Sequence, residues 1–166
     1  ARSGSGSKNI FNVDSQDEGD FLARKYPHSI FQELLEPVNQ EVTCAVYRAK
    51  DGRVSVLQLL RKLTEGTTSW AKVIDNKEVL EMCRKIAKGI VLQGSMNIQL
   101  ILTDSGPRIF EINPRFSSTV LMRHKLGFCD LLWSLDEVKG LSVDFPSIGI
   151  NQCMVRTQGV ERINFE

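Results

Sequence analysis

Alternating apolar and polar positions mark the central part of the chain. Residues 41–49 and 53–63 alternate in this way and are joined by Asp51-Gly52, so they predict a β-hairpin. Residues 76–92 instead repeat apolar side chains at helical spacing and predict an amphipathic helix. The side chains of this helix that we expect in the core are Val79, Leu80, Cys83, Ile86, Ala87 and Ile90. The pattern therefore predicts antiparallel strands with a helix packed on them.

A second pair of apolar runs flanks residues 104–106, Asp-Ser-Gly, which have the chemistry of a tight turn. A loop of these three residues predicts that Gln99 faces Glu111 across the hairpin, with Asn97 and Asn113 next along. Because side chains alternate along a strand, these polar groups share one face. The same register predicts a mostly apolar opposite face made of three pairs: Ile98 with Ile112, Leu100 with Phe110, and Leu102 with Arg108.

The two ends of the chain carry shorter patterns. Residues 9–13 and 29–35 predict strands on either side of a helix that starts after Asp14 or Ser15 and ends by Lys25. After the second hairpin, two short helices separated by Gly127 and a last hairpin are predicted. The ranges are 119–125 and 129–138 for the helices and 151–165 for the hairpin, with Gln158-Gly159 as its turn and Met154 and Val155 packed on the sheet.

The composition is that of a folded globular protein. The chain has 166 residues, 42% of them hydrophobic and 25% charged, and a formal net charge of +1. This balance argues against a broad nucleic-acid interface, and no apolar run approaches the roughly 20 residues that a membrane span needs. The four cysteines are scattered, so we expect reduced thiols in a cytoplasmic protein. The chain starts at Ala1 within a Gly/Ser-rich stretch, and we expect it to begin inside a larger polypeptide.

The polar face of the second hairpin is the main candidate for chemistry. Gln99, Glu111 and Asn113 offer oxygen ligands of the kind that Mg²⁺ takes together with substrate phosphates. Arg115 follows two residues after Asn113, where a planar cation can bind a phosphate oxygen. An edge strand with one solvated face explains the same residues without any metal.

Two other segments could bring cations to phosphates. Residues 2–8, RSGSGSK, combine glycines, hydroxyls and two cations, as a phosphate-binding loop does, and a flexible linker has the same composition. Arg61 and Lys62 end the strand predicted over residues 53–63. We interpret these two side chains as a solvated strand end.

The string Q-(x11)-E-I-N-P-R, from Gln99 to Arg115, resembles the second half of the nucleotide site in ATP-grasp ligases. The resemblance is greatest to the ATP-grasp modules of the carbamoyl-phosphate synthase large chain and covers roughly residues 2–140. It implies that Gln99, Glu111 and Asn113 hold Mg²⁺, with Mn²⁺ as an alternative, and that Glu111, Asn113 and Arg115 act in catalysis. It also implies ATP-binding roles for four groups of residues. These are the Gly-rich loop (Gly4, Ser5, Gly6, Ser7 and Lys8), the adenine hinge (Gln32, Glu33, Leu34 and Leu35), the ribose ligand Glu41 and the metal ligand Gln99.

The resemblance also implies an α+β fold in two parts. Residues 1–36 would form a partial lid subdomain, strand-helix-strand, that carries the Gly-rich loop. Residues 37–166 would form the C-terminal subdomain, an antiparallel sheet flanked by helices that holds the Mg-nucleotide site. Two departures from the synthase modules are visible. Glu65-Gly66-Thr67 replaces a His-Thr-Gly string, which makes the match to these modules less close, and Phe116-Ser117-Ser118 lacks a second arginine, which bears on the substrate.

The function that the resemblance implies is an ATP- and Mg-dependent carboxylate-amine or carboxylate-ammonia ligase module that forms an acyl phosphate. Its partners would be ATP, a small carboxylate or bicarbonate, and an upstream domain of the same polypeptide or a partner subunit. We expect no nucleic acid and no membrane, and a homo-oligomer stays open. The chain alone is expected to be inactive. A non-catalytic Mg-ATP module for regulation or assembly is the alternative, and a metal-free structural domain is the third hypothesis.

Overall fold

A computed structural model describes residues 10–157 of the chain. The chain divides into two compact units, Ala1–Leu35 and Glu36–Glu166. No helix in the described part is long and apolar enough to cross a membrane. The elements, in chain order, are α1 (Gln16–Lys25), the 3-10 helix η1 (Val38–Gln40), β1 (Glu41–Arg48), β2 (Val54–Thr64), β3 (Thr67–Ile74), α2 (Lys77–Gly89), β4 (Gly94–Thr103), β5 (Gly106–Asn113), α3 (Val120–Lys125), α4 (Asp130–Val138) and β6 (Cys153–Val155).

The first unit contains α1 and two extended segments. Ser15 begins the helix because its hydroxyl oxygen accepts a hydrogen bond from the backbone N–H of Glu18 at 3.3 Å. The predicted strands are not formed at residues 10–13 or 29–35, and Asn9 lies outside the described residues. Two short strands without a shared buried face are not stable by themselves, so these segments do not form strands. Their exposed apolar side chains are Ile10, Phe11, Val13, Ile30, Phe31 and Leu34.

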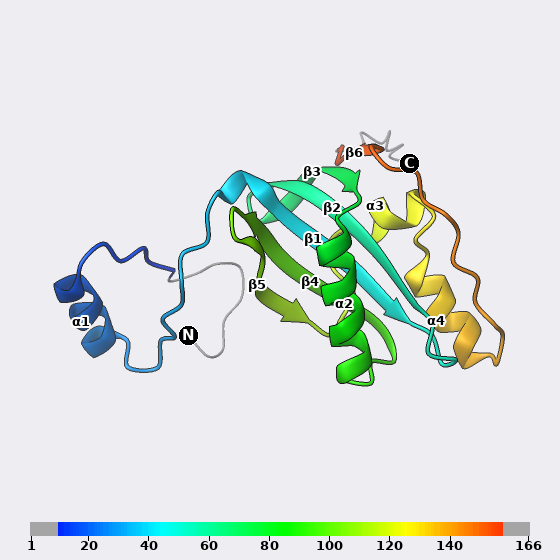
Figure 1. Cartoon of the computed structure of the whole chain (residues 1–166), viewed down its shortest axis with the longest axis horizontal. Helices are drawn as coiled ribbons and strands as arrows, with labels where there is room; N and C mark the ends of the chain where they lie inside the picture. The colour runs from blue at the N-terminus through cyan, green and yellow to red at the C-terminus, as the bar shows by residue number, and fades with distance from the viewer. Residues whose placement is uncertain (1–9, 158–166) are drawn as a thin grey trace, which may run out of the picture. The chain divides into compact units, whose positions relative to one another are not determined.

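The second unit is built on a six-stranded sheet in the order β5-β4-β1-β2-β3-β6, and all neighbouring strands are antiparallel (Figure 1). The predicted first hairpin is confirmed, with Val46 paired to Val56. Its turn works because Gly52 takes a φ of 91°, which costs a glycine little. The sheet is therefore the antiparallel α+β framework that the sequence implied.

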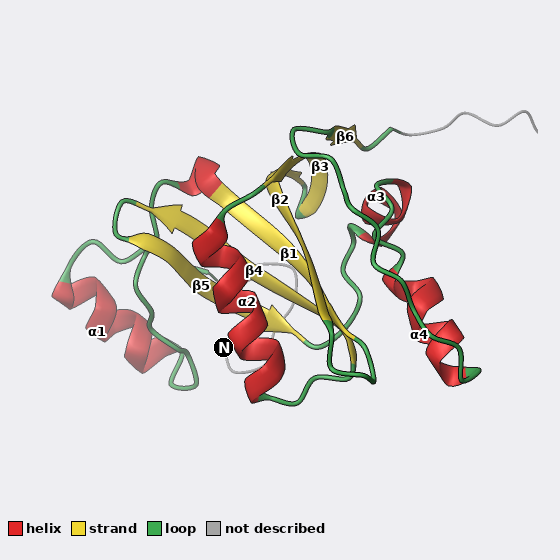
Figure 2. Cartoon of the chain, turned by 45° about the vertical axis from the view of Figure 1, so that its right-hand side comes forward, coloured by secondary structure: helices red, strands yellow, loops and turns green. Residues whose placement is uncertain are grey.

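Helix α2 covers one face of the sheet (Figure 2). It begins where the side-chain oxygen of Asn76 accepts a hydrogen bond from the N–H of Val79 at 3.1 Å. Val79, Cys83 and Ala87 are fully buried against Val42, Cys44 and Val46 of β1. Each large apolar side chain buried here contributes ~1.5–3 kcal/mol of transfer free energy. The core position predicted for Ile90 is wrong, because this residue follows the last helical turn and is 57% exposed.

Helices α3 and α4 pack on the other face, on either side of Gly127 as predicted. Trp133 of α4 makes edge-to-face contacts with Tyr47 of β1 and with Phe128. Burial raises the pKa of Tyr47 to about 12, and its hydrogen bond of 2.9 Å to Glu137 acts in the same direction. On this face the apolar core includes Ala45 and Tyr47 of β1, whereas Thr43 and Glu41, the preceding residues on the same face, are polar.

Strand β6 lies at the sheet edge beside β3, where Met154 pairs with Ala71 and packs against the core. Val155 is 63% exposed, so its predicted packing on the sheet is wrong. An edge strand of three residues buries only one of its two faces. The predicted turn at Gln158-Gly159 lies outside the described residues.

Candidate functional site

The polar side chains predicted on the second hairpin share one face of the sheet. Gln99 of β4 pairs with Glu111 of β5 on one side and with Thr43 of β1 on the other, and Asn97 pairs with Asn113. Side chains of directly paired residues point to the same face. The register predicted for these pairs is therefore confirmed, and Gln99 lies at the centre of the polar face.

Nearer the turn, the predicted register is wrong by one residue. The structure pairs Leu100 with Ile109 and Leu102 with Pro107, because a β-bulge interrupts β5 after the Gln99–Glu111 pair. The turn is correspondingly shorter, with Thr103 paired to Gly106. The bulge adds one residue to β5, and the turn has one residue fewer than predicted. The two differences cancel, so the Gln99–Glu111 pair and the pairs beyond it keep the predicted register.

Glu111 and Asn113 contact each other directly: the Asn113 amide nitrogen donates to Glu111 Oε1 at 2.7 Å. Glu111 is exposed, whereas Gln99 and Asn113 are half-buried. Residues 10–157 contain no group of three or more His, Cys, Asp or Glu side chains that could hold a metal ion. The donor set is thus one carboxylate and two amides, which fits Mg²⁺ only when phosphate oxygens complete its coordination.

The segment after β5 turns sharply and presents Arg115 to solvent. The N–H of Arg115 donates to the carbonyl oxygen of Asn113 at 2.8 Å, and Nη1 donates to the carbonyl of Phe116 at 3.0 Å. Two residues later Ser117 is buried, and its hydroxyl accepts from Nη1 of Arg123 at 3.0 Å. This buried contact anchors the segment while the guanidinium of Arg115 stays accessible.

Arg123, which holds Ser117, also forms a buried ion pair with Asp130. Arg123 donates through Nε to Asp130 Oδ1 at 3.0 Å and through Nη2 to Oδ2 at 2.5 Å, and the two side chains are 0% and 1% exposed. Burial lowers the pKa of Arg123, and the charge of Asp130 opposes that shift. The pair joins the start of α4 to α3 directly beneath the segment that carries Arg115.

Arg61 is a site residue that the sequence interpretation missed. It is 8% exposed, not solvated, and donates to Glu41 through Nε at 3.0 Å and through Nη2. Its Nη2 also donates to Gln99 Oε1. The signal was present, because Leu59 pairs with Thr43 and alternation puts Arg61 on the same face. Lys62, the next residue, is exposed as predicted.

The other residues predicted to bind nucleotide fall in three parts of the chain. Gln32, Glu33, Leu34 and Leu35 belong to the first unit, where they form an extended segment. The Gly-rich loop, from Gly4 to Lys8, lies outside the described residues. Glu41, the predicted ribose ligand, is the first residue of β1 and lies on the polar face.

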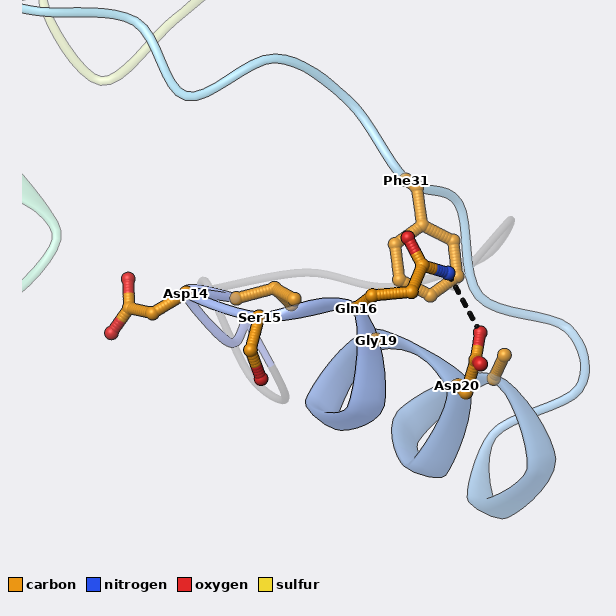
Figure 3. Close-up of a pocket in the computed structure, with 8 residues that line it drawn as sticks. Asp14, Ser15, Gln16, Gly19, Asp20 and Phe31 are labelled. Carbon is orange, nitrogen blue, oxygen red and sulfur yellow. Dashed lines mark hydrogen bonds between the residues drawn. The ribbon is translucent and has the colours of Figure 1, made fainter.

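The first unit also has an open pocket beside the start of α1, with Gln16 hydrogen-bonded to Asp20 at 2.9 Å (Figure 3). Two carboxylates, Asp14 and Asp20, line it, and they would repel a phosphate. None of the residues predicted to bind nucleotide lines this pocket. We therefore place the candidate site on the sheet.

The family follows from comparison with known proteins. A family model described as ATP-grasp in the biosynthetic pathway with Ter operon matches residues 33–156. The chain belongs to this ATP-grasp family. The ATP-grasp fold that the string from Gln99 to Arg115 implied is thereby confirmed. No curated protein matches the chain.

Solved structures with the same fold share little sequence with this ATP-grasp chain. N5-carboxyaminoimidazole ribonucleotide synthetase from Thermus thermophilus is 13% identical with a TM-score of 0.61, over 86% of this chain and 42% of that chain. N5-carboxyaminoimidazole synthase from Aspergillus clavatus is 16% identical with a TM-score of 0.61, over 86% and 41%. The phosphoribosylaminoimidazole carboxylase ATPase subunit from Aquifex aeolicus is 22% identical with a TM-score of 0.54, over 63% and 35%. The chain thus spans less than half the length of these proteins, and the finer resemblance to carbamoyl-phosphate synthase stays a prediction.

Proposed function

We propose that this ATP-grasp chain is the nucleotide-binding part of a ligase that joins a small carboxylate or bicarbonate to an amine or ammonia. The observation that carries the proposal is the pairing of Gln99 with Glu111, on the same sheet face as Asn113 and Glu41. Oxygen donors from three adjacent strands thus surround one region of the sheet. A merely solvated edge strand does not require such donors on the strands beside it.

Gln99, Glu111 and Asn113 are the residues that would hold Mg²⁺. When bound, this ion offsets negative charge on the phosphate oxygens of ATP. The single carboxylate in the set suits a cation that arrives with a triphosphate, since Mg²⁺ is usually held by one or two carboxylates plus phosphates. Arg115 would bind a phosphate oxygen, because its accessible guanidinium has only a backbone carbonyl as its side-chain partner among the described residues.

The rest of ATP falls to residues named by the family resemblance. Glu41 would accept hydrogen bonds from the ribose hydroxyls. The segment Gln32, Glu33, Leu34 and Leu35 would contact adenine, and residues Gly4 to Lys8 would cover the phosphates. The solved Aspergillus clavatus structure is described as a complex with ADP and 5-aminoimidazole ribonucleotide, which supports a nucleotide at this fold.

The reaction has two steps. A carboxylate oxygen of the substrate attacks the γ-phosphorus of ATP, and the bond from that phosphorus to the bridging oxygen of ADP breaks, giving an acyl phosphate and ADP. The amine then attacks the carbonyl carbon, inorganic phosphate leaves, and the amine loses a proton. The protein positions the reactants and stabilises charge, and Arg115 is placed to stabilise the transferred phosphoryl group.

Binding of Mg-ATP is the first test. Thermal unfolding of the chain is followed with and without millimolar Mg-ATP, because a ligand at 100 times its Kd stabilises the folded state by about 2.7 kcal/mol. We expect a rise in the unfolding midpoint that requires both Mg²⁺ and ATP. A folded protein with no shift would favour the metal-free structural domain.

Catalysis is tested in a longer form of the protein, in which ADP release is measured against a panel of small carboxylates with ammonia or an amine. We expect ADP release that depends on one of these carboxylates. Mg-ATP binding without release under every carboxylate would favour the non-catalytic module.

A further inference from the structure

Arg61 links three strands of the second unit from a nearly solvent-free position. Its guanidinium, carried by β2, donates to Glu41 of β1, to Gln99 of β4 and to the hydroxyl of Thr68 of β3, the last at 3.4 Å. The side chain of Arg61 is 8% exposed and that of Glu41 is 16% exposed. The arginine therefore contacts the proposed ribose ligand and the proposed metal ligand at the same time.

The chemistry of arginine makes this contact rigid. A guanidinium is planar, stays charged at any ordinary pH and offers five N–H donors in a fixed geometry. Burying it is unfavourable unless those donors are paired, so its acceptors are held in place in turn. Arg61 uses only Oε1 of Glu41, and the structure gives Oε2 no hydrogen-bond partner among residues 10–157. One carboxylate oxygen is thus held by the protein and the other is left for a ligand.

Gln99, unlike Glu41, has only one side-chain oxygen, and Arg61 already donates to it. Its Oε1 accepts from Arg61, and this is the oxygen that a divalent cation would take. A cation at that oxygen would lie close to the positive guanidinium, and the two charges would repel. Binding of a cation at Gln99 therefore acts on the same arginine that orients Glu41.

We propose that Arg61 is a positioning residue that couples the ribose end of the nucleotide site to its metal end. The inference rests on the proposed function and gives a role to a residue that the sequence analysis interpreted as a solvated strand end. It requires that the contributions of Glu41 and Gln99 to Mg-ATP binding depend on each other only while Arg61 is present.

A mutant cycle measures this dependence. The Kd of Mg-ATP is determined by isothermal titration calorimetry for the full chain, for Glu41→Gln, for Gln99→Ala and for the double variant. The same four measurements are made in an Arg61→Lys background. Lysine keeps the charge opposite Glu41 but lacks the planar fork that reaches two acceptors.

In the native background we expect each single change to raise the Kd 10- to 100-fold, as loss of a supporting contact typically does. The Kd of the double variant should rise by a factor that is roughly fivefold smaller than the product of the two single increases.

In the Arg61→Lys background, the increase in Kd of the double variant should equal the product of the two single increases. An Arg61→Met background, which removes every donor, is the second variant should lysine take over the contact to Gln99. Arg53→Lys is the matched control, because Arg53 pairs with Asp51 and both side chains are about half exposed. The control background should keep the native non-additivity. Thermal unfolding confirms that each variant used is folded.

The outcomes separate the inference from the proposed function. If the native chain binds no Mg-ATP, the proposed function fails and the inference falls with it. If the chain binds Mg-ATP but the losses of Glu41→Gln and Gln99→Ala already multiply in the native background, only the coupling role of Arg61 is overturned. Persistence of non-additivity in both Arg61 backgrounds would overturn it as well.

Discussion

Gln99 lies directly opposite Glu111 across the β4–β5 ladder, and both side chains point to the face that also carries Glu41. Paired positions on one face of an antiparallel ladder have Cβ atoms about 5 Å apart, which is within reach of one cation for two side chains of this length. Had the two side chains lain on opposite faces, no metal site could have formed here.

Glu111→Gln should abolish ADP release in the longer protein and leave folding intact. The change removes the only carboxylate of the Gln99, Glu111 and Asn113 set, and Glu111 is exposed, so its replacement should alter stability by no more than about 0.5 kcal/mol. Coupled-enzyme detection of ADP and a urea unfolding curve measure the two effects. The matched control is Glu81→Gln on α2, an exposed carboxylate in an i,i+3 ion pair with Arg84. ADP release that survives the change at position 111 would remove Glu111 from the mechanism.

Arg115→Ala should lower the rate of ADP release by roughly 10²-fold or more with little change in stability. Groups that stabilise developing charge are worth about this much, and the side chain of Arg115 contacts only a backbone carbonyl among the described residues. Single-turnover kinetics at saturating ATP measure the chemical step. Arg84→Ala, which removes an arginine from α2 whose side chain is 43% exposed, is the control. Equal rates for the two variants would contradict a role in phosphoryl transfer.

Arg123→Met should destabilise the chain by about 3–5 kcal/mol, because it leaves the buried Asp130 without its charged partner and with only the Ser95 hydroxyl donating to it. Urea denaturation gives the free energy of unfolding. Changing both residues, Arg123→Met with Asp130→Leu, should recover much of the loss, since no unpaired charge then remains in the core. A loss below about 1 kcal/mol for the single change would show that Asp130 is paired or hydrated in another way.

Tyr47 should ionise at about 12, about two pKa units above the ordinary value for tyrosine, because burial and the hydrogen bond to Glu137 both oppose the charged form. The stability linked to this shift is fully present below pH 10, the ordinary tyrosine value, and is lost as the pH rises through 12. Absorbance at alkaline pH follows the two tyrosines, and Tyr47→Phe assigns the later transition. An assigned transition near pH 10 would show that the phenol is solvated.

Local signals account for most of the second unit. Asp51-Gly52 and Gly127 each act within a few residues, through a turn and a helix end, and the structure has both features where they were predicted. The helix predicted over residues 76–92 is also formed, as α2, and the structure adds that Asn76 caps it. The polar face also followed from alternation alone. The misplaced register near Phe110 did no harm at the site, because a bulge and a shorter turn cancelled.

The assignments that failed depend on neighbours distant in sequence. Arg61 was interpreted as a solvated strand end, yet its acceptors Glu41 and Gln99 lie 20 and 38 residues away along the chain. The segment 29–35 has the composition of a strand, but a ladder needs a second strand, which the described residues do not provide.

The sequence by itself determined the two hairpins, the helix that α2 forms and the placement of Gln99, Glu111 and Asn113 on one face, since backbone periodicity is a short-range property. Only the tertiary structure decided which charges are buried and how the strands outside these two hairpins pair, such as β1 with β4. Burial and ladder hydrogen bonds are properties of several segments at once, so Arg61 and Arg123 acquire their partners only when the sheet and its helices have come together.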